Sequence, residues 1–254
     1  MPEARYDYGR AGFFGVLTPQ ANPTVEAEMR VLLPQDGVIC SARCVSAAAD
    51  STQRLIDYFE RLPETVVAFD QLKLDVAGFA CTGSSYLLGA EREARLLSDG
   101  TEALGAPVIS ATQAIDEALR AAGVTTIAFV APYPDALIDA GVRYWSAKGY
   151  RVHKRFRVDT GSRDTRLIYQ LGSADALASV TKARAGVDAV LLSGTGMPTL
   201  ALYADVSAPP IFSSNPCLAW AMRRRVGRDP ASDFSVQELA RRAINACQKN
   251  REAS

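Results

Sequence analysis

The chain has 254 residues, of which 48% are hydrophobic and 22% are charged, and its formal net charge is zero. This composition is typical of a globular protein with a real core, and it lacks the basic balance of a nucleic-acid-binding domain. Residues 1–10 contain no apolar core of a signal peptide, and no apolar run approaches the roughly 20 residues of a membrane helix. We therefore expect a cytoplasmic protein without nucleic-acid or membrane partners.

The five cysteines contain no Cys-x-x-Cys pair, and their number is odd. A disulfide framework or a zinc site is therefore not expected. The single histidine, His153, lies in a stretch that alternates like a half-exposed strand, 151–155. We expect it to face solvent, which makes a catalytic triad or a cysteine–histidine pair improbable.

Short apolar runs alternate with longer segments that carry apolar residues at helical spacing. In chain order we predict strands at 13–17 and 38–45, a helix at 52–72, a strand at 76–80, a helix at 84–97 that Ser84 or Ser85 caps, a strand at 106–110 and a helix at 111–122. The pattern then starts again, with a strand at 126–130, a helix at 135–148, a strand at 151–158, a largely helical stretch at 164–185, a strand at 188–192, a short helix or turn at 197–206, a strand at 210–212 and a helix at 216–226. Strands that alternate with helices predict an α/β fold with parallel sheets.

The second half of the chain repeats the first. Residues 75–83 (DVAGFACTG) are similar to residues 188–196 (DAVLLSGTG). A local match of this kind predicts two similar Rossmann-like lobes related by a pseudo-two-fold axis. We expect one lobe to contain residues 1–105 with 210–254, and the other to contain residues 106–209.

The spacing of the strand ends supports this repeat. Pro19 ends one strand and Cys81 follows another, 62 positions later, and Pro132 and Gly194 are separated by the same 62 positions. In open parallel sheets, ligands bind beyond the carboxyl ends of the strands. We therefore expect one small site between the lobes, with Cys81 on one wall and Gly194 on the other.

Cys81 has three features of a reactive thiol. It closes a buried strand, it opens a polar loop, and it lies near a helix N-terminus, where the dipole and free N–H groups favour a thiolate or a bound carboxylate. The candidate hydrogen-bonding groups beside it and in the matching loop are those of Thr82, Gly83, Ser84, Ser193 and Thr195. Most cysteines are inert core residues, and Ser, Thr and Gly are ordinary turn residues, so a structural interpretation stays open. No phosphate-binding or dinucleotide-binding signature follows a strand, so a nucleotide cofactor is not indicated.

Three segments resemble one known group of enzymes. They are residues 15–28 (GVLTPQANPTVEAE), residues 80–84 (ACTGS), and residues 210–215 (PIFSSN) followed by Trp220. Together they are similar to the maleate cis–trans isomerase and arylmalonate decarboxylase branch of the Asp/Glu racemase superfamily. The resemblance covers about residues 11–227.

This resemblance implies a two-lobed enzyme, without cofactor or metal, that acts on a small carboxylate. It implies that the loop from Pro19 to Asn22 binds a substrate carboxylate, that Cys81 is the nucleophile, and that Tyr133 helps to hold the substrate. Lobed α/β enzymes of this size often pair, so we expect a homo-oligomer, either a dimer or a tetramer.

The sequence departs from the family pattern at two places. Racemases of the superfamily and maleate isomerases have a second cysteine where this chain has Gly194. A two-base racemase needs an acid or base on each face of the substrate carbon, so racemisation becomes improbable. The family also tends to have a substrate-binding asparagine after the strand at 151–158, where this chain has Arg163 and Arg166. Either arginine could hold a carboxylate or lie in solvent.

Three hypotheses follow. The first is a cofactor-free isomerase in which Cys81 adds to the double bond of a maleate-like dicarboxylate. The second is a decarboxylase of a malonate-type acid in which Cys81 is the proton donor. The resemblance implies that arylmalonate decarboxylases carry their cysteine at the position of Gly194 and glycine at that of Cys81, so this chain would be the mirrored arrangement. The third is a non-catalytic protein that binds small acids.

Overall fold

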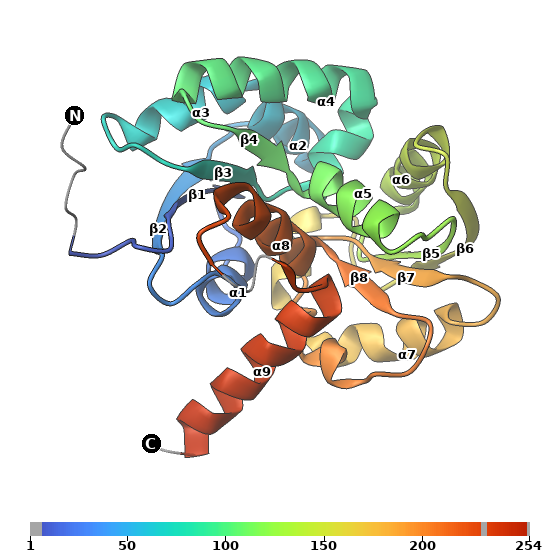
Figure 1. Cartoon of the computed structure of the whole chain (residues 1–254). Coiled ribbons are helices and arrows are strands. Elements are labelled where there is room, and N and C mark those ends of the chain that lie inside the picture. Colours follow the sequence, from blue (N-terminus) through green and yellow to red (C-terminus); the bar gives the residue numbers. More distant parts are fainter. Residues whose placement is uncertain (1–6, 230–232, 253–254) are drawn as a thin grey trace.

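The structure, a computed structural model, describes residues 7–229 and 233–252. It consists of two parallel four-stranded sheets, with strand orders β2-β1-β3-β4 and β6-β5-β7-β8 (Figure 1). The first sheet is formed by β1 (Phe13–Pro19), β2 (Val38–Cys44), β3 (Val76–Phe79) and β4 (Val108–Ser110). The second is formed by β5 (Thr126–Ala131), β6 (Arg151–Arg157), β7 (Ala189–Leu192) and β8 (Ile211–Ser213). The predicted two-lobed α/β fold is therefore confirmed.

Helices connect the strands and cover the sheets. The first half contains α1 (Thr24–Leu32), α2 (Ser51–Glu60), α3 (Leu62–Val66), the 3-10 helix η1 (Val67–Phe69), α4 (Thr82–Leu104) and α5 (Ala111–Ala121). The second contains α6 (Asp135–Ala147), η2 (Thr165–Gln170), α7 (Ser173–Ala183), η3 (Leu200–Ala204), α8 (Ser214–Val226) and α9 (Val236–Glu252). The sequence patterns predicted neither the separate α9, which projects from the body in Figure 1, nor the breaks inside two predicted helices.

Those breaks have local causes. Residues 52–72 do not form one helix, because Pro63 has no N–H to donate and therefore lies in the first turn of a new helix, α3. The stretch 164–185 divides into η2 and α7, because an extended break at Leu171 and Gly172 separates them. The division places η2 against the region between the sheets, where three of its residues line a cavity.

The internal repeat is visible in the hydrogen bonds of the two lobes. In the first lobe, the N–H of Phe13 donates to the carboxylate of Asp75, 62 residues away, at 2.8 Å. In the second, the N–H of Thr126 donates to Asp188, also 62 residues away, at 2.8 Å. Equivalent aspartates thus fix the start of the central strand pair in each sheet, and the two sheets have the same strand order.

The lobe boundaries predicted from the sequence need correction. Residues 106–110 were expected in the second lobe, but β4 pairs with β3 in the first sheet. Residues 210–213 were expected in the first lobe, but β8 pairs with β7 in the second sheet. The helix that follows, α8, does pack on the first sheet, because a Cβ at Gly78 of β3 would lie 2.7 Å from Sδ of Met222. The chain therefore crosses between the lobes at α8.

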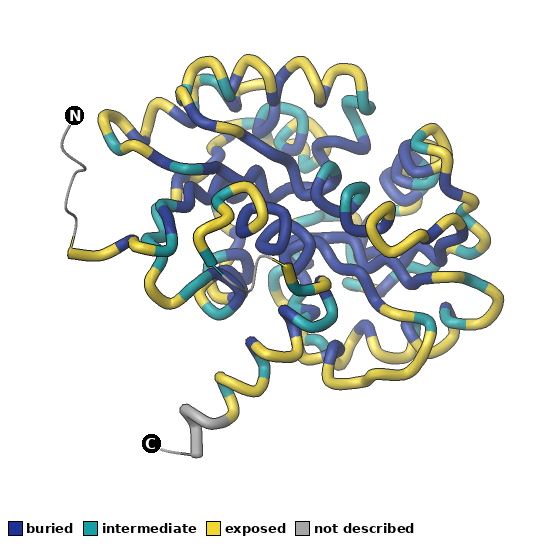
Figure 2. Tube along the Cα trace, viewed as in Figure 1, coloured by how far each residue is buried: buried dark blue, intermediate teal, exposed yellow. Residues whose placement is uncertain are grey.

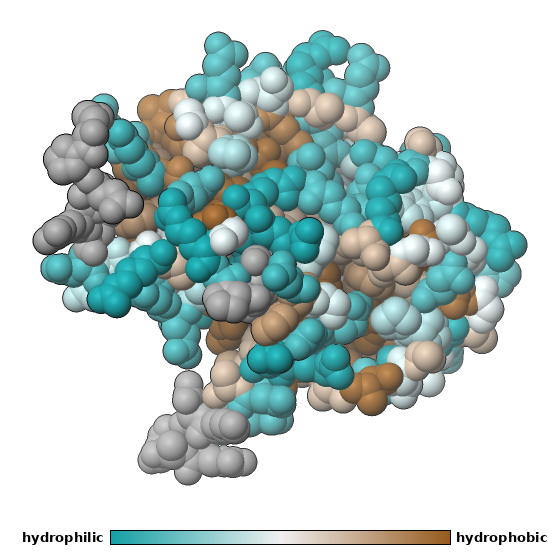
Figure 3. Space-filling model, viewed as in Figure 1, coloured by the Kyte–Doolittle hydropathy of each residue, from teal (hydrophilic) through white to brown (hydrophobic). Residues whose placement is uncertain are grey.

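The edge strands β2 and β6 are partly exposed, the other strands form the buried centre of the molecule, and the helices carry many exposed residues (Figure 2). Large, fully buried side chains come from both sheets, including Phe14, Phe79, Phe129 and Phe212. Hydrophilic residues cover most of the face shown in Figure 3, and hydrophobic residues appear on it as scattered patches. No helix among residues 7–229 and 233–252 combines the length and apolar character needed to cross a membrane.

The close approach of α8 to β3 is testable. Gly78→Ala should lower the free energy of unfolding by about 1–3 kcal/mol, because the added methyl group overlaps Met222 and Leu218. Urea denaturation measures this loss. Met222→Ala vacates part of that space, so the double variant should lose less than the sum of the two single losses. Strictly additive losses would show that the methyl group added at position 78 does not contact the side chain of Met222.

Candidate active site

The carboxyl ends of the central strands of the two sheets face each other. The hydroxyl of Thr195, after β7, donates to the carbonyl of Ala80, after β3, at 2.8 Å. Asn22 Nδ2, after β1, donates to Thr195 Oγ1 at 3.3 Å, and Thr24 Oγ1 donates to the carbonyl of Gly196 at 2.8 Å. These contacts join segments more than 100 residues apart. They hold the loops of the two lobes against each other.

A small cavity of about 30 Å³ lies between these loops. It is lined by Pro19, Asn22, Leu55, Cys81, Tyr133, Thr165, Ile168, Tyr169, Gly194, Thr195 and Gly196. The structure therefore brings six of the sequence-predicted site residues to one cavity, namely Pro19, Asn22, Cys81, Tyr133, Gly194 and Thr195. The space enclosed by these residues is that of a water or two, and the cavity is open to solvent on one side.

Cys81 stands at the N-terminus of α4. It is the N-cap residue, so the prediction that Ser84 or Ser85 caps the helix is wrong. Ser84 Oγ donates to the sulfur at 3.1 Å, and the backbone N–H groups of Gly83 and Ser84 also stabilise its charged form. Burial nevertheless dominates and raises the pKa of the Cys81 thiol above its ordinary value. The helix N-terminus therefore does not produce the thiolate expected from the sequence, because the cost of desolvation exceeds the gain from these hydrogen bonds.

Thr82 and Ser193 lie behind the cavity wall rather than on it. Thr82 Oγ1 is 2.7 Å from the hydroxyl of Tyr133, and Ser193 Oγ donates to Thr82 Oγ1 at 3.0 Å. Both side chains are fully buried, and Tyr133 is 5% exposed. Burial and the nearby Cys81 raise the pKa of Tyr133, so its phenol stays protonated and can donate a hydrogen bond. Thr82 and Ser193 contact the cavity through Tyr133.

Asn22 is held in one orientation. Its Oδ1 accepts hydrogen bonds from the N–H groups of Thr24 and Val25, at 2.9 and 3.3 Å, at the start of α1. The amide nitrogen therefore points across to Thr195 and the cavity. A fixed amide donor of this kind suits a carboxylate oxygen.

Gly194 has a backbone that disfavours a side chain. Its φ is +115°, a conformation that residues with a Cβ rarely adopt. A Cβ built there would lie 3.1 Å from Cδ of Pro132 and 3.6 Å from the hydroxyl of Tyr133. The N–H of Gly194 donates to Ser214 Oγ at 3.1 Å, which fixes the turn. The face of the cavity opposite Cys81 therefore offers no acid or base from this position.

The remaining wall is largely apolar and was missed by the sequence reasoning. Leu55 comes from α2, and Thr165, Ile168 and Tyr169 come from η2. Three hydrophobic residues close in sequence to the candidate loops, Tyr86, Leu87 and Met197, do not line this cavity. Leu55 had a helical apolar pattern that marks a core residue equally well, and nothing in the pattern of 164–185 predicted that η2 faces the site.

The two arginines considered as carboxylate ligands lie elsewhere. Arg163 and Arg166 are exposed and do not line the cavity. Arg166 pairs instead with Asp164, at 2.9 Å from its Nε. His153 is exposed on β6, as predicted. Cys217, which follows another strand-end loop, is fully buried outside the cavity, and burial raises its pKa.

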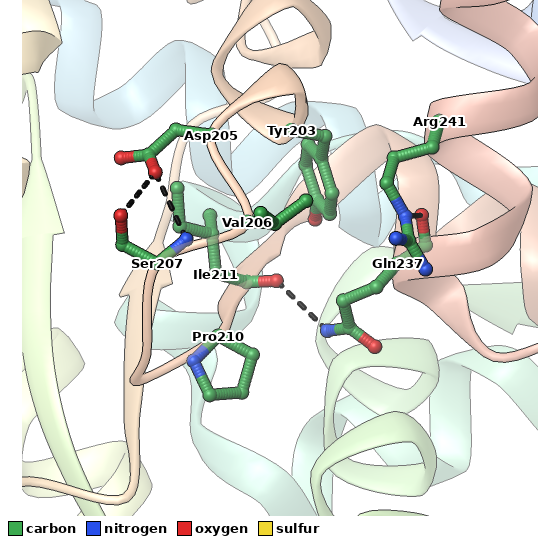
Figure 4. Close-up of a pocket in the computed structure, with 8 residues that line it drawn as sticks. All are labelled: Tyr203, Asp205, Val206, Ser207, Pro210, Ile211, Gln237 and Arg241. Carbon is green, nitrogen blue, oxygen red and sulfur yellow. Dashed lines mark hydrogen bonds between the residues drawn. The ribbon is translucent and has the colours of Figure 1, made fainter.

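In the described part of the chain, no three His, Cys, Asp or Glu residues are grouped closely enough to hold a metal ion. A second cavity of about 140 Å³ lies between η3 and α9 (Figure 4). It is lined by Tyr203, Asp205, Val206, Ser207, Pro210, Ile211, Gln237 and Arg241. None of the sequence-predicted site residues lines it, and its walls contain no thiol. The interlobe cavity is therefore the better candidate for chemistry.

Fold and site together define a two-lobed α/β protein with one thiol, among the described residues, lining a cavity between the lobes. The chain belongs to the arylmalonate decarboxylase family, whose model matches residues 14–237. A maleate isomerase of Geobacillus stearothermophilus is 26% identical over 150 residues, which span 54% of this chain and 60% of that protein.

Two solved structures show the same fold. A mutant maleate cis–trans isomerase of Nocardia farcinica with a covalently bound succinylcysteine intermediate has a TM-score of 0.75 and 22% identity, over 85% of this chain and 93% of that one. Arylmalonate decarboxylase has a TM-score of 0.70 and 20% identity, over 85% of this chain and 92% of that one.

Introducing a second thiol at position 194 should destabilise the fold. Gly194→Cys should lower the free energy of unfolding by about 1–3 kcal/mol, since any Cβ at this φ is strained. Gly194→Ala is the matched control, and it should lose nearly as much because it shares the Cβ but lacks the sulfur. Urea denaturation of both variants measures the effect. Wild-type stability in the cysteine variant would contradict this account.

Proposed function

We propose that this chain is a cofactor-independent, cysteine-dependent isomerase of a small unsaturated dicarboxylate of the maleate type. The observation that carries the proposal is the position of Cys81. Its thiol lines the interlobe cavity at a helix N-terminus, and glycine stands opposite it. The maleate isomerase relative and the succinylcysteine intermediate of the Nocardia farcinica enzyme support a covalent route through cysteine.

In this route the sulfur of Cys81 forms a bond to one alkene carbon, and the π electron pair moves towards the far carboxylate as an enediolate. The carbon–carbon bond, now single, rotates. The electron pair then returns, the carbon–sulfur bond breaks, and the trans isomer leaves. The proton that the Cys81 thiol loses passes to water and returns to the sulfur after it is expelled, so the reaction consumes neither acid nor base.

Other residues at the cavity bind the substrate and stabilise the charges that develop in the reaction. Asn22, in the loop from Pro19, binds one carboxylate through its fixed amide nitrogen. Tyr133 donates to the enediolate, supported by Thr82 and Ser193 behind it. The loop of Gly194 and Thr195 contributes the opposite wall. Gly83 and Ser84 stabilise the thiolate of Cys81 as it forms, through their N–H groups and the Ser84 hydroxyl.

A second candidate is decarboxylation of a malonate-type acid, and two observations favour it. The raised pKa of Cys81 keeps the thiol protonated, which suits a proton donor. The apolar wall of Leu55, Ile168 and Tyr169 suits a hydrocarbon substituent better than a second carboxylate. Here the bond to one carboxylate breaks, carbon dioxide leaves, and the electron pair forms an enediolate. Cys81 protonates the carbon, and water restores the thiol.

We also infer that the protein works in the cytoplasm as a homo-oligomer. The first inference rests on the five free cysteines, which suit a reducing compartment, and the second on the frequent pairing of lobed α/β enzymes of this size. Sedimentation of the purified chain measures the second directly.

Turnover separates the candidates. Proton NMR of the wild-type protein with maleate should show fumarate, and Cys81→Ala should lower the rate at least about 10³-fold, because the covalent step is lost. Cys40→Ser, a thiol outside the cavity, is the matched control and should keep the wild-type rate. Loss of carbon dioxide from a substituted malonate, without fumarate from maleate, would select the decarboxylase instead. If the wild type turned over neither acid and Cys81→Ala bound maleate normally, the protein would be a non-catalytic binder.

The pH profile distinguishes the two roles of the thiol. Because burial raises the pKa of Cys81, little thiolate exists at neutral pH. For isomerisation, kcat/KM should therefore rise with pH and continue to rise above about 8.5, the pKa of a free cysteine. For decarboxylation with the thiol as acid, kcat/KM should stay level through neutral pH and fall at high pH. A rise complete below pH 7 would contradict the raised pKa.

A further inference from the structure

A line of buried hydrogen-bonding groups leads from the cavity to the indole of Trp145. Tyr133 OH lies 2.7 Å from Thr82 Oγ1, which accepts a hydrogen bond from Ser193 Oγ at 3.0 Å. Ser193 Oγ lies 2.7 Å from the hydroxyl of Tyr86, which accepts from Trp145 Nε1 at 3.0 Å. All five side chains are at most 5% exposed. Four hydroxyl groups thus connect the cavity wall to one indole.

The direction of these hydrogen bonds follows from the chemistry of the last member. An indole N–H only donates, whereas each hydroxyl has one hydrogen to give. Tyr86 accepts from Trp145, and its remaining partners are the hydroxyls of Ser193, at 2.7 Å, and of Thr82, so Tyr86 gives its hydrogen to the line, at Ser193. Ser193 then donates to Thr82, and Thr82 donates to Tyr133. In the reverse order the hydrogen of Tyr86 would have no acceptor among these groups, and a buried unmade hydrogen bond is costly.

In this order the hydrogen of Tyr133 is not needed by Thr82 or Ser193, so it can be given to a ligand in the cavity that Tyr133 lines. We propose that Trp145 is a positioning residue: its N–H occupies one acceptor position of the Tyr86 oxygen and keeps the Tyr86 hydrogen directed to Ser193, so that Tyr133 presents a hydrogen, not a lone pair, to the ligand. Each bond in such a line also polarises the next, which strengthens the final donor. The role rests on the proposed function in one respect, because both candidate reactions pass through an enediolate that this hydrogen stabilises.

Packing holds the indole in place. Trp145 is fully buried in α6, and its ring meets that of Tyr86 edge to face, with centroids 6.3 Å apart and planes at 72°. The ring of Tyr144 packs against both of these rings. Its centroid lies 5.2 Å from that of Trp145 and 5.4 Å from that of Tyr86. The hydroxyl of Tyr144 donates to Glu93 at 2.5 Å and takes no part in the line. Tyr144 is therefore a buried neighbour of Trp145 and Tyr86 whose hydroxyl has a different hydrogen-bond partner.

Trp145→Phe tests the proposal, because it keeps an aromatic ring and removes the N–H. Tyr86→Phe interrupts the same line one step later, and Tyr144→Phe is the matched control. For whichever acid the wild type turns over, kcat should fall about 10-fold in the first two variants, with KM within about 2-fold, because the misdirected donor acts on the enediolate. The control should keep both values within about 2-fold.

A spectroscopic measurement tests the line without any turnover. In protein labelled with ¹³C at tyrosine Cζ, the Tyr133 resonance, assigned with Tyr133→Phe, reports whether its hydroxyl donates or accepts. It should move in Trp145→Phe and Tyr86→Phe but not in Tyr144→Phe. An unchanged resonance in Trp145→Phe, or an equal change in the control, would overturn the proposal. If the resonance moves as expected and no acid is turned over, the hydroxyl line stands and the proposed function fails.

Discussion

The site depends on one buried contact, the hydrogen bond from Thr195 Oγ1 to the carbonyl of Ala80. It joins the ends of the central strands of two separate sheets, and a buried bond of this kind contributes about 1 kcal/mol net, while an unpaired carbonyl would cost about 1–3 kcal/mol. Asn22 completes the contact through Thr195. Because the contact brings the two strand ends together, the adjacent residues, Cys81 and Gly194, line one cavity. The two halves of the repeat thus meet at one candidate site through this junction and the contacts beside it.

The two walls are chemically unequal, and the inequality is built into the backbone. Cys81 has extended φ and ψ angles and begins a helix, whereas Gly194 has a φ of +115° that disfavours a side chain. The symmetric fold therefore carries an asymmetric site, with a thiol on one face and none opposite. Racemisation through two bases does not fit this geometry. The two proposed reactions, covalent addition and one-sided protonation, both fit it, and each involves a thiol whose pKa is raised by burial.

The sequence predicted the features that depend on neighbours along the chain. The strands, the repeat and the positions of Cys81 and Tyr133 at strand ends follow from local patterns, and the structure agrees with them. It did not predict the features that depend on how elements pack. Leu55 and Tyr169 reach the cavity because α2 and η2 fold over it, and Trp145 meets Tyr86 because α6 packs against α4. The net pKa shift of Cys81 was missed for the same reason, since burial is a property of the packed fold.

The most direct test of this account is the alkylation of Cys81 by iodoacetamide across a pH series, with and without maleate, followed by peptide mass spectrometry. We expect slow labelling at pH 7, a rate that rises only above about pH 8.5, and protection by maleate, because the thiol is buried in the cavity proposed to bind the substrate. Labelling at pH 7 as fast as that of an exposed cysteine, or no protection by the diacid, would contradict the claim that Cys81 is the single buried thiol of this site.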